Sequence, residues 1–114
     1  MSLEPYHPVD ADEAEELIAK GVKVIDVRQP YEYGYDHIDQ ALLVSIDGLY
    51  SFSQALNQIN LSKDEPLIFV CEMGQRSTAA CEVAAIAGYT NIYNLSGGMN
   101  MWRYSGKMVV KGKK

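Results

Sequence analysis

The chain of 114 residues has the length of one ordinary domain and is long enough to bury a single core. Hydrophobic residues make up 47% and charged residues 22%, a balance that excludes a disordered chain. The net charge of −5 argues against nucleic acid as a partner of the whole chain. Residues 1–60 hold 11 acidic and 3 basic residues, whereas residues 61–114 hold 4 acidic and 7 basic ones, which favours an anionic ligand near the second half.

The chain carries no sequence signal for a membrane or for export. No stretch approaches the roughly 18 apolar residues of a membrane helix, and residues 1–16 lack the basic start and apolar run of a signal peptide. Cys71 and Cys81 are too few for a disulfide framework, and the absence of a CxxC pair disfavours a zinc ribbon or a thioredoxin-like centre. We therefore expect a cytoplasmic protein, although residues 1–3 could be an expression scar that replaced a native leader.

The predicted elements alternate between helix and strand. Residues 10–21 predict a helix that Asp10 caps, with Glu13 completing a capping box and Gly21 ending it. Short apolar runs then predict strands covered on both faces, at residues 22–27, 41–46, 66–71 and 91–95. Further helices are expected at residues 51–60 and 77–88. This order is typical of an α/β domain with parallel strands and helices on both faces.

The sequence "CEMGQRS" (residues 71–77) begins at the last residue of the third apolar run. In parallel sheets, ligands bind beyond the carboxyl ends of the strands, which is where Cys71 is expected. A turn from strand to helix directs backbone N–H groups toward its centre, where they favour an anion. Gly74 leaves room for the backbone to curl, and the Arg76 guanidinium adds a positive charge suited to an oxyanion. The pattern predicts a nucleophilic Cys71 thiolate, but a cysteine that only packs the strand end stays open here.

Three segments, in order, resemble the motifs of the rhodanese-like domain family. "VIDVRQPYEYGYDHI" (residues 24–38) resembles its first motif, an Asp-Val-Arg followed by Glu and an aromatic residue and then by His-Ile. "CEMGQRS" is similar to its active-site loop CxxGxRS, and "NLSGGMNMW" (residues 94–102) resembles its closing Leu-x-Gly-Gly-x-x-x-Trp motif. The resemblance implies the rhodanese-like α/β fold, with a central, mostly parallel sheet and helices on both faces. We expect one domain over residues 1–114, with a core at about 5–106 and a flexible tail at 107–114.

The same resemblance implies a sulfurtransferase. Cys71 would take sulfane sulfur from a small donor, thiosulfate or a persulfide, and pass it to cyanide, to a thiol or to a sulfur-relay protein. The loop that surrounds the sulfur and binds the substrate corresponds to Glu72, Met73, Gly74, Gln75, Arg76 and Ser77. The resemblance implies no metal and no organic cofactor.

Three positions depart from the family pattern. Asp36 and Gln40 stand where the family commonly has glycine, which puts the geometry of the first crossover in doubt. Thiosulfate-preferring members often carry a basic residue after the cysteine, where this chain has Glu72. An acidic side chain at this position disfavours an incoming dianion, so the sulfur donor need not be thiosulfate.

The remaining candidate residues have mainly structural interpretations. Arg28 and Glu32 are spaced to form an ion pair on a turn, and His37 is expected to be a hydrogen-bonded connector. Cys81 is expected in the core, with a resolving role for Cys71 as the alternative. Trp102 is expected to cap the core, and three tyrosines could rim the pocket or pack: Tyr31, Tyr33 and Tyr35.

Two other functions compete with sulfur transfer. A phosphatase or arsenate reductase of related fold would also use a thiolate and an arginine, but its arginine lies six positions after the cysteine, whereas Arg76 lies five after Cys71. The shorter loop fits a sulfur atom better than a phosphate. A non-catalytic rhodanese-like binding module usually lacks the cysteine, and this chain retains Cys71 with its whole loop.

Overall fold

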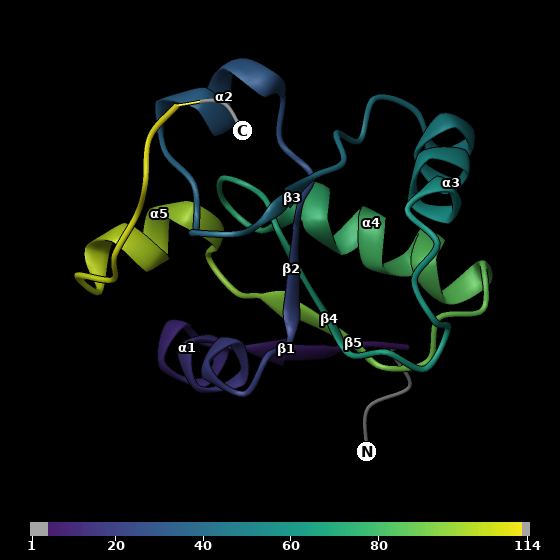
Figure 1. Cartoon of the computed structure of the whole chain (residues 1–114), viewed down its shortest axis with the longest axis horizontal. Helices are drawn as coiled ribbons and strands as arrows, with labels where there is room; N and C mark the ends of the chain where they lie inside the picture. The colour runs from purple at the N-terminus through teal and green to yellow at the C-terminus, as the bar shows by residue number, and fades with distance from the viewer. Residues whose placement is uncertain (1–4, 113–114) are drawn as a thin grey trace.

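The computed structural model describes residues 5–112 and contains, within them, the strands and helices labelled in Figure 1. The strands are β1 (His7–Val9), β2 (Lys23–Asp26), β3 (Leu42–Leu43), β4 (Leu67–Val70) and β5 (Ile92–Leu95). The helices are α1 (Ala11–Ala19), α2 (Pro30–Tyr35), α3 (Leu49–Gln58), α4 (Gln75–Ile86) and α5 (Gly98–Tyr104).

The strands form one five-stranded sheet in the order β1-β5-β4-β2-β3, and each neighbouring pair is parallel. Asp26 lies opposite Val70, so β2 and β4 end at the same level. From these two central strands the chain crosses in opposite directions, through α4 to β5 and through α2 to β3. The order of the sheet therefore reverses between β4 and β2, which is the point where parallel sheets of this kind open a crevice at their carboxyl edge.

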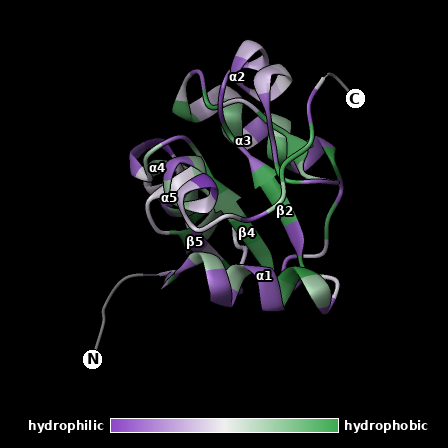
Figure 2. Ribbon diagram, turned by 90° about the vertical axis from the view of Figure 1, so that its left-hand side faces the viewer, coloured by the Kyte–Doolittle hydropathy of each residue, from purple (hydrophilic) through white to green (hydrophobic). Residues whose placement is uncertain are grey.

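Helices cover both faces of the sheet, with α1 and α5 on one side and α3 and α4 on the other (Figure 1). All four residues of β4 are buried, and they alternate between two hydrophobic clusters. Leu67 and Phe69 pack with side chains of α3 and α4, whereas Ile68 and Val70 pack with side chains of α1, α2 and α5. Figure 2 shows the hydrophobic strands β2 and β4 between the helices. The predicted α/β fold with covered faces is confirmed.

Most of the predicted elements are present, but the strand expected at residues 41–46 is reduced to Leu42–Leu43 and is exposed rather than covered. Several short elements were missed. The capping box of α1 is formed, since the Glu13 N–H donates to Asp10 Oδ1 at 2.8 Å and the Asp10 N–H donates to Glu13 Oε1 at 2.9 Å. The sequence did not predict β1, α2 and α5, which have 3, 6 and 7 residues. Such short segments carry too few residues for a hydrophobic period.

The segment after residue 106, expected to be a flexible tail, makes several contacts. Lys107 Nζ lies 2.7 Å from Asp12 Oδ1. The backbone groups of Val110 and His37 exchange hydrogen bonds of 2.8 and 2.9 Å. Residues 107–110 therefore pack against the domain, while residues 113–114 of the expected tail lie outside the described part of the chain. Within residues 5–112, no helix has the length and apolar character needed to span a membrane.

Candidate active site

Cys71 lies directly after β4 and is buried, with 1% of its surface exposed. The Gly74 N–H donates to Cys71 Sγ at 3.1 Å, so the loop directs one backbone donor at the sulfur. Gly74 adopts the left-handed conformation (φ 106°) as the N-cap of α4, a conformation that side chains oppose. The turn that the sequence predicted at "CEMGQRS" thus brings the start of α4 against the thiol.

The loop is held in place by the start of α5. The Met99 N–H donates to the Cys71 carbonyl at 2.8 Å, and the Asn100 N–H donates to the Glu72 carbonyl at 2.9 Å. A Cβ atom at Gly98 would overlap both carbonyl groups. Gly98 therefore permits the close approach by which the free N–H groups of α5 satisfy the carbonyls of the loop.

A chain of side-chain hydrogen bonds lies behind the sulfur. Ser77 Oγ is 3.4 Å from Cys71 Sγ and 2.6 Å from Asn94 Oδ1. Asn94 Nδ2 in turn donates to Thr78 Oγ1 at 3.2 Å, and the Thr78 hydroxyl donates to the Gly74 carbonyl at 2.7 Å. Ser77 and Asn94 are buried, so the sulfur contacts a closed polar network on the side toward β5.

Glu32 pairs with Arg76, so the predicted ion pair between Arg28 and Glu32 is wrong. Both Arg76 guanidinium Nη atoms donate to the two Glu32 carboxylate oxygens, at 2.8 and 2.9 Å. The reason is that residues 30–35 form α2, which turns Glu32 toward the loop, while Arg28 stays at the end of β2. The hydrogen bonds from Arg76 lower the pKa of Glu32 to about 2, although desolvation opposes the shift. In this arrangement Arg76 neutralises a carboxylate, and it also acts electrostatically on Cys71.

Arg28 joins a second network of opposite charges. Its guanidinium donates to Asp26 Oδ2 at 2.9 Å and to Glu72 Oε1 at 3.3 Å. Arg103 of α5 binds both Glu72, at 2.7 Å, and Asp36, at 2.6 Å. Hydrogen bonds from Arg103 lower the pKa of Asp36 and of Glu72 below their usual ranges. The Glu72 carboxylate is thus paired with two guanidinium groups and does not face the pocket as an isolated charge.

A pocket of about 500 Å³ lies beside the loop and is lined by charged and aromatic side chains: Arg28, Tyr31, Glu32, Tyr35, Glu72 and Arg103. Of the three tyrosines in α2, Tyr31 and Tyr35 are exposed at this pocket. Tyr33 packs instead in the core, where its hydroxyl donates to the Ala41 carbonyl at 2.6 Å. Met73 and Gln75, the other predicted substrate-binding side chains, are exposed on the loop.

Three residues with structural interpretations behave as expected. His37 is buried, stacks on Tyr33, and has its Nδ1 atom 2.8 Å from the Tyr33 carbonyl oxygen. Trp102 is buried over the core and donates through Nε1 to the Met108 carbonyl at 2.9 Å. Cys81 is fully buried among the core side chains between the sheet and α4, and burial raises the pKa of its thiol.

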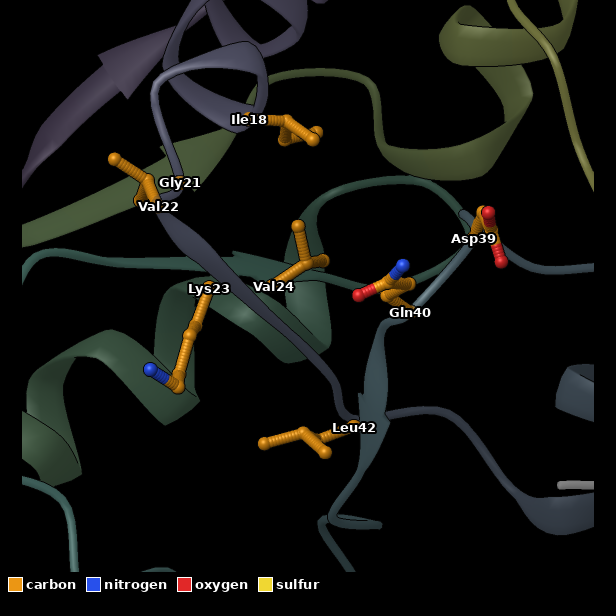
Figure 3. Close-up of a pocket in the computed structure, with 8 residues that line it drawn as sticks. All are labelled: Ile18, Gly21, Val22, Lys23, Val24, Asp39, Gln40 and Leu42. Carbon is orange, nitrogen blue, oxygen red and sulfur yellow. The ribbon is translucent and has the colours of Figure 1, made fainter.

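A second pocket, of about 510 Å³, is lined by the residues labelled in Figure 3. Its lining comes from the end of α1, the start of β2 and the segment that leads into β3. Lys23 lies opposite Leu67 at the amino end of β4, so this pocket is at the end of the sheet opposite to Cys71. Among residues 5–112 there is no group of three or more His, Cys, Asp or Glu side chains suited to a metal ion.

Sequence reasoning missed three residues that build the site: Asp36, Asn94 and Arg103. Asp36 was noted only as a replaced glycine, and its carboxylate binds Arg103, which follows it by 67 residues. Asn94 begins the closing motif, but the motif gives no sign that its side chain reaches Ser77. These contacts join residues of separate elements that are far apart along the chain. A single sequence has no pattern from which such contacts could be predicted.

The structure is a parallel α/β domain with a cysteine-centred loop at the switch point of its sheet. Comparison with known proteins shows which family of such domains it belongs to. The sequence model of the rhodanese-like domain matches residues 10–105. The chain belongs to the rhodanese-like domain family. It is 27% identical over 101 residues to the thiosulfate sulfurtransferase GlpE of Pseudomonas fluorescens, covering 89% of this chain and 88% of that protein. Against GlpE of Ectopseudomonas mendocina the identity is 29%, with the same coverage.

Solved structures give the same result for the fold. A rhodanese-related protein from Thermoplasma volcanium superimposes with a TM-score of 0.79 and is 28% identical, covering 92% of this chain and 98% of that one. The polysulfide-sulfur transferase of Wolinella succinogenes has a TM-score of 0.77 at 22% identity, covering 94% of this chain and 80% of that one. The family and its fold are therefore established, although the sequence identity to each named relative is below 30%.

Proposed function

We propose that the protein is a sulfurtransferase that carries sulfane sulfur as a persulfide on Cys71. The observation that carries the proposal is the position of Cys71 Sγ at the switch point of the sheet, 3.1 Å from the Gly74 N–H at the start of α4. A backbone donor and the positive end of a helix both favour the thiolate over the thiol. The names of the relatives, thiosulfate sulfurtransferases, support the same class of reaction.

The reaction needs two displacements at sulfur. In the first, the Cys71 thiolate attacks the outer sulfur of the donor, the new S–S bond forms, and sulfite leaves thiosulfate with the electron pair. A persulfide donor would release a thiolate instead. In the second, an acceptor attacks the terminal sulfur and Cys71 leaves as a thiolate, so that cyanide becomes thiocyanate and a thiol becomes a persulfide. The atoms and electrons balance without an external oxidant, reductant, metal or organic cofactor.

The remaining loop residues have supporting roles in this proposal. Gly74 supplies a backbone donor, and Ser77 contacts the sulfur from the other side at 3.4 Å. Arg76 holds α2 against the loop through its hydrogen bonds to Glu32, and its guanidinium interacts electrostatically with Cys71. Met73 and Gln75 are exposed where a donor or a partner protein would approach. A reducing compartment such as the cytoplasm would keep both thiols free.

The geometry favours sulfur transfer over phosphoryl chemistry. A phosphatase loop uses its arginine to bind the oxygens of a tetrahedral oxyanion, but both Nη atoms of Arg76 are engaged with Glu32. A purely binding module would not need a buried cysteine with a backbone donor directed at its sulfur. A binding module is the alternative function that the following experiment tests.

The test is the intact mass of the protein after incubation with thiosulfate, with glutathione persulfide, or with a cysteine desulfurase and cysteine. We expect a gain of one sulfur, about 32 Da, that is absent in Cys71→Ser and present in Cys81→Ala. Adding cyanide should remove the extra mass and produce thiocyanate. A protein that gains no sulfur from any of the three donors would be a binding module.

A further inference from the structure

The hydrogen-bond chain behind Cys71 has a direction, because each hydroxyl has a single proton. The Ser77 hydroxyl lies 2.6 Å from Asn94 Oδ1, which can only accept, so Ser77 donates to Asn94. The Thr78 hydroxyl donates to the Gly74 carbonyl and accepts from Asn94 Nδ2. Toward Cys71, the Ser77 oxygen is therefore left as an acceptor for the S–H group, 3.4 Å away.

This direction suits the thiol and opposes the thiolate. A thiolate has no proton to donate, so Ser77 would present lone pairs to a negative sulfur. If the Ser77 hydroxyl rotated to donate to the sulfur, the buried Asn94 Oδ1 would lose its donor, which carries a desolvation cost. Neither arrangement satisfies every group while the Asn94 carboxamide keeps its orientation.

A half-turn of the Asn94 carboxamide about its Cβ–Cγ bond removes the conflict. The carboxamide has nearly the same shape in both orientations, so the turn requires no movement of β5. After it, Nδ2 donates to Ser77, the Ser77 hydroxyl donates to the sulfur, and Oδ1 accepts from the Thr78 hydroxyl. The Gly74 carbonyl loses the Thr78 hydroxyl but keeps the Thr78 backbone N–H as a donor at 3.3 Å. This carbonyl also lies 3.2 Å from Ser77 Oγ, so it competes with the sulfur for the Ser77 hydroxyl proton.

We propose that Asn94 is a positioning residue whose carboxamide orientation decides whether Ser77 accepts from the Cys71 thiol or donates to its thiolate. The proton lost by Cys71 goes to solvent, and no covalent bond changes other than S–H. Arg76 and Cys81, both on α4, are titratable groups that interact electrostatically with Cys71. The inference rests on the proposed function only in treating the thiolate as the reactive form.

The first test follows the side-chain amide of Asn94 by NMR in the uniformly ¹⁵N-labelled protein. We expect its two NH₂ resonances to shift with pH at the same inflection as the alkylation rate of Cys71 by iodoacetamide. In Ser77→Ala, the resonances should no longer follow that inflection, because the link to the sulfur is removed. Asn94 resonances that stay constant across the ionisation of Cys71 would overturn the proposal.

The second test compares the same substitution at two asparagines, one in β5 and one just before it. Asn94→Asp fixes an acceptor in front of Ser77 and should raise the alkylation inflection by about one pH unit, as expected for the loss of a hydrogen bond to a charged group. Asn91→Asp makes the same chemical change just before the first residue of β5 and should shift it by less than about 0.3 unit. In a Ser77→Ala background, the effect of Asn94→Asp should fall by more than half. An equal shift in both backgrounds would mean that the added charge acts through space, and the proposal would be wrong.

The NMR test with Ser77→Ala covers the case in which Asn94→Asp does not fold, because it needs no charged substitution. These measurements use ionisation and alkylation without a sulfur donor. They can therefore contradict the role of Asn94 while Cys71 still gains sulfur from a donor. They can equally support that role in a protein that gains no sulfur.

Discussion

Cys71 and Cys81 carry the same thiol in opposite surroundings. Cys71 Sγ has the Gly74 N–H and the Ser77 hydroxyl as polar neighbours, whereas Cys81 Sγ lies 3.8 Å from the Tyr93 carbonyl, a weak contact. Burial raises the pKa of the Cys81 thiol, so its anion is disfavoured at neutral pH. The side chain of Cys81 therefore packs in the core, and its resolving role stays an alternative to be tested.

The first prediction separates the two thiols by reactivity. Alkylation of the native protein near neutral pH should modify Cys71, and this reaction should vanish in Cys71→Ser. Cys81→Ala should keep most of the sulfur-transfer activity and lose about 1 kcal/mol of unfolding free energy. A disulfide between the two cysteines during turnover would show that Cys81 has a resolving role instead.

The second prediction concerns the backbone at Gln40, where the family commonly has glycine. Gln40 has a φ of 67°, in the left-handed region that side chains other than Asn and Asp disfavour. Gln40→Gly should raise the unfolding free energy by about 0.5–1 kcal/mol, measured by urea denaturation. Asn60→Gly is the matched control, since Asn60 has a φ of 60° but tolerates it better, and its gain should be smaller. Equal gains at both positions would contradict this explanation.

At the scale of elements, ion pairs connect the loop to the helices on either side of it. Arg76 connects α4 to α2 through Glu32, and Arg103 connects α5 to the loop through Glu72. The pairing of Glu72 changes the reason for which it should disfavour thiosulfate. Its carboxylate does not repel a dianion as an isolated charge; it occupies two guanidinium groups that could otherwise attract one.

The third prediction follows from this pairing. Glu72→Gln removes one negative charge beside the pocket and frees the guanidinium donors that Arg28 and Arg103 direct to it, so kcat/KM for thiosulfate should rise about five-fold at low ionic strength, equivalent to about 1 kcal/mol. The gain should shrink as salt is added, and a neutral persulfide donor should benefit much less. Glu65→Gln, which breaks a surface ion pair with Lys23, should leave kcat/KM unchanged for both sulfur donors. Thiosulfate kinetics that stay the same at low salt would mean that Glu72 does not control access.

At the scale of the molecule, the sequence predicted the buried strands and the turn that carries Cys71. The buried strands β2, β4 and β5 are short apolar runs, and the turn at Gly74 follows from a cysteine, a glycine and an arginine in close succession. The partners of these residues were not predictable in the same way. Arg103 and Asp36 are 67 residues apart, and their pairing depends on how α5 packs beside α2. Such contacts follow from the folded topology, so the loop was predicted and its supporting charges were not.

The lowered pKa values of the carboxylates make the stability of the whole molecule depend on pH in a definite direction. Glu32 has a pKa of about 2 in the folded protein, because Arg76 binds it, against an ordinary value of 4.5. Between these two values the unfolded chain binds more protons than the folded one, so stability rises with pH. The contribution of Glu32 is therefore complete above about pH 5 and is lost as the pH falls from 4.5 toward 2. Asp36 and Glu72, whose pKa values Arg103 lowers, add to the same trend.

The fourth prediction measures this contribution by urea denaturation from pH 2 to pH 7. Glu32→Gln should lower the unfolding free energy at pH 7 by on the order of 1–2 kcal/mol, less than the full shift implies because solvent reaches Arg76. The difference between the wild type and the variant should decrease steadily below pH 4.5, since Glu32 becomes protonated there in the unfolded chain while it keeps its charge in the folded protein down to about pH 2. Glu16→Gln, at an exposed position of α1, should leave the curve unchanged. A difference that stays constant down to pH 2 would show that Glu32 stabilises the fold through neutral contacts, such as its hydrogen bond from the Gln29 N–H, rather than through its charge.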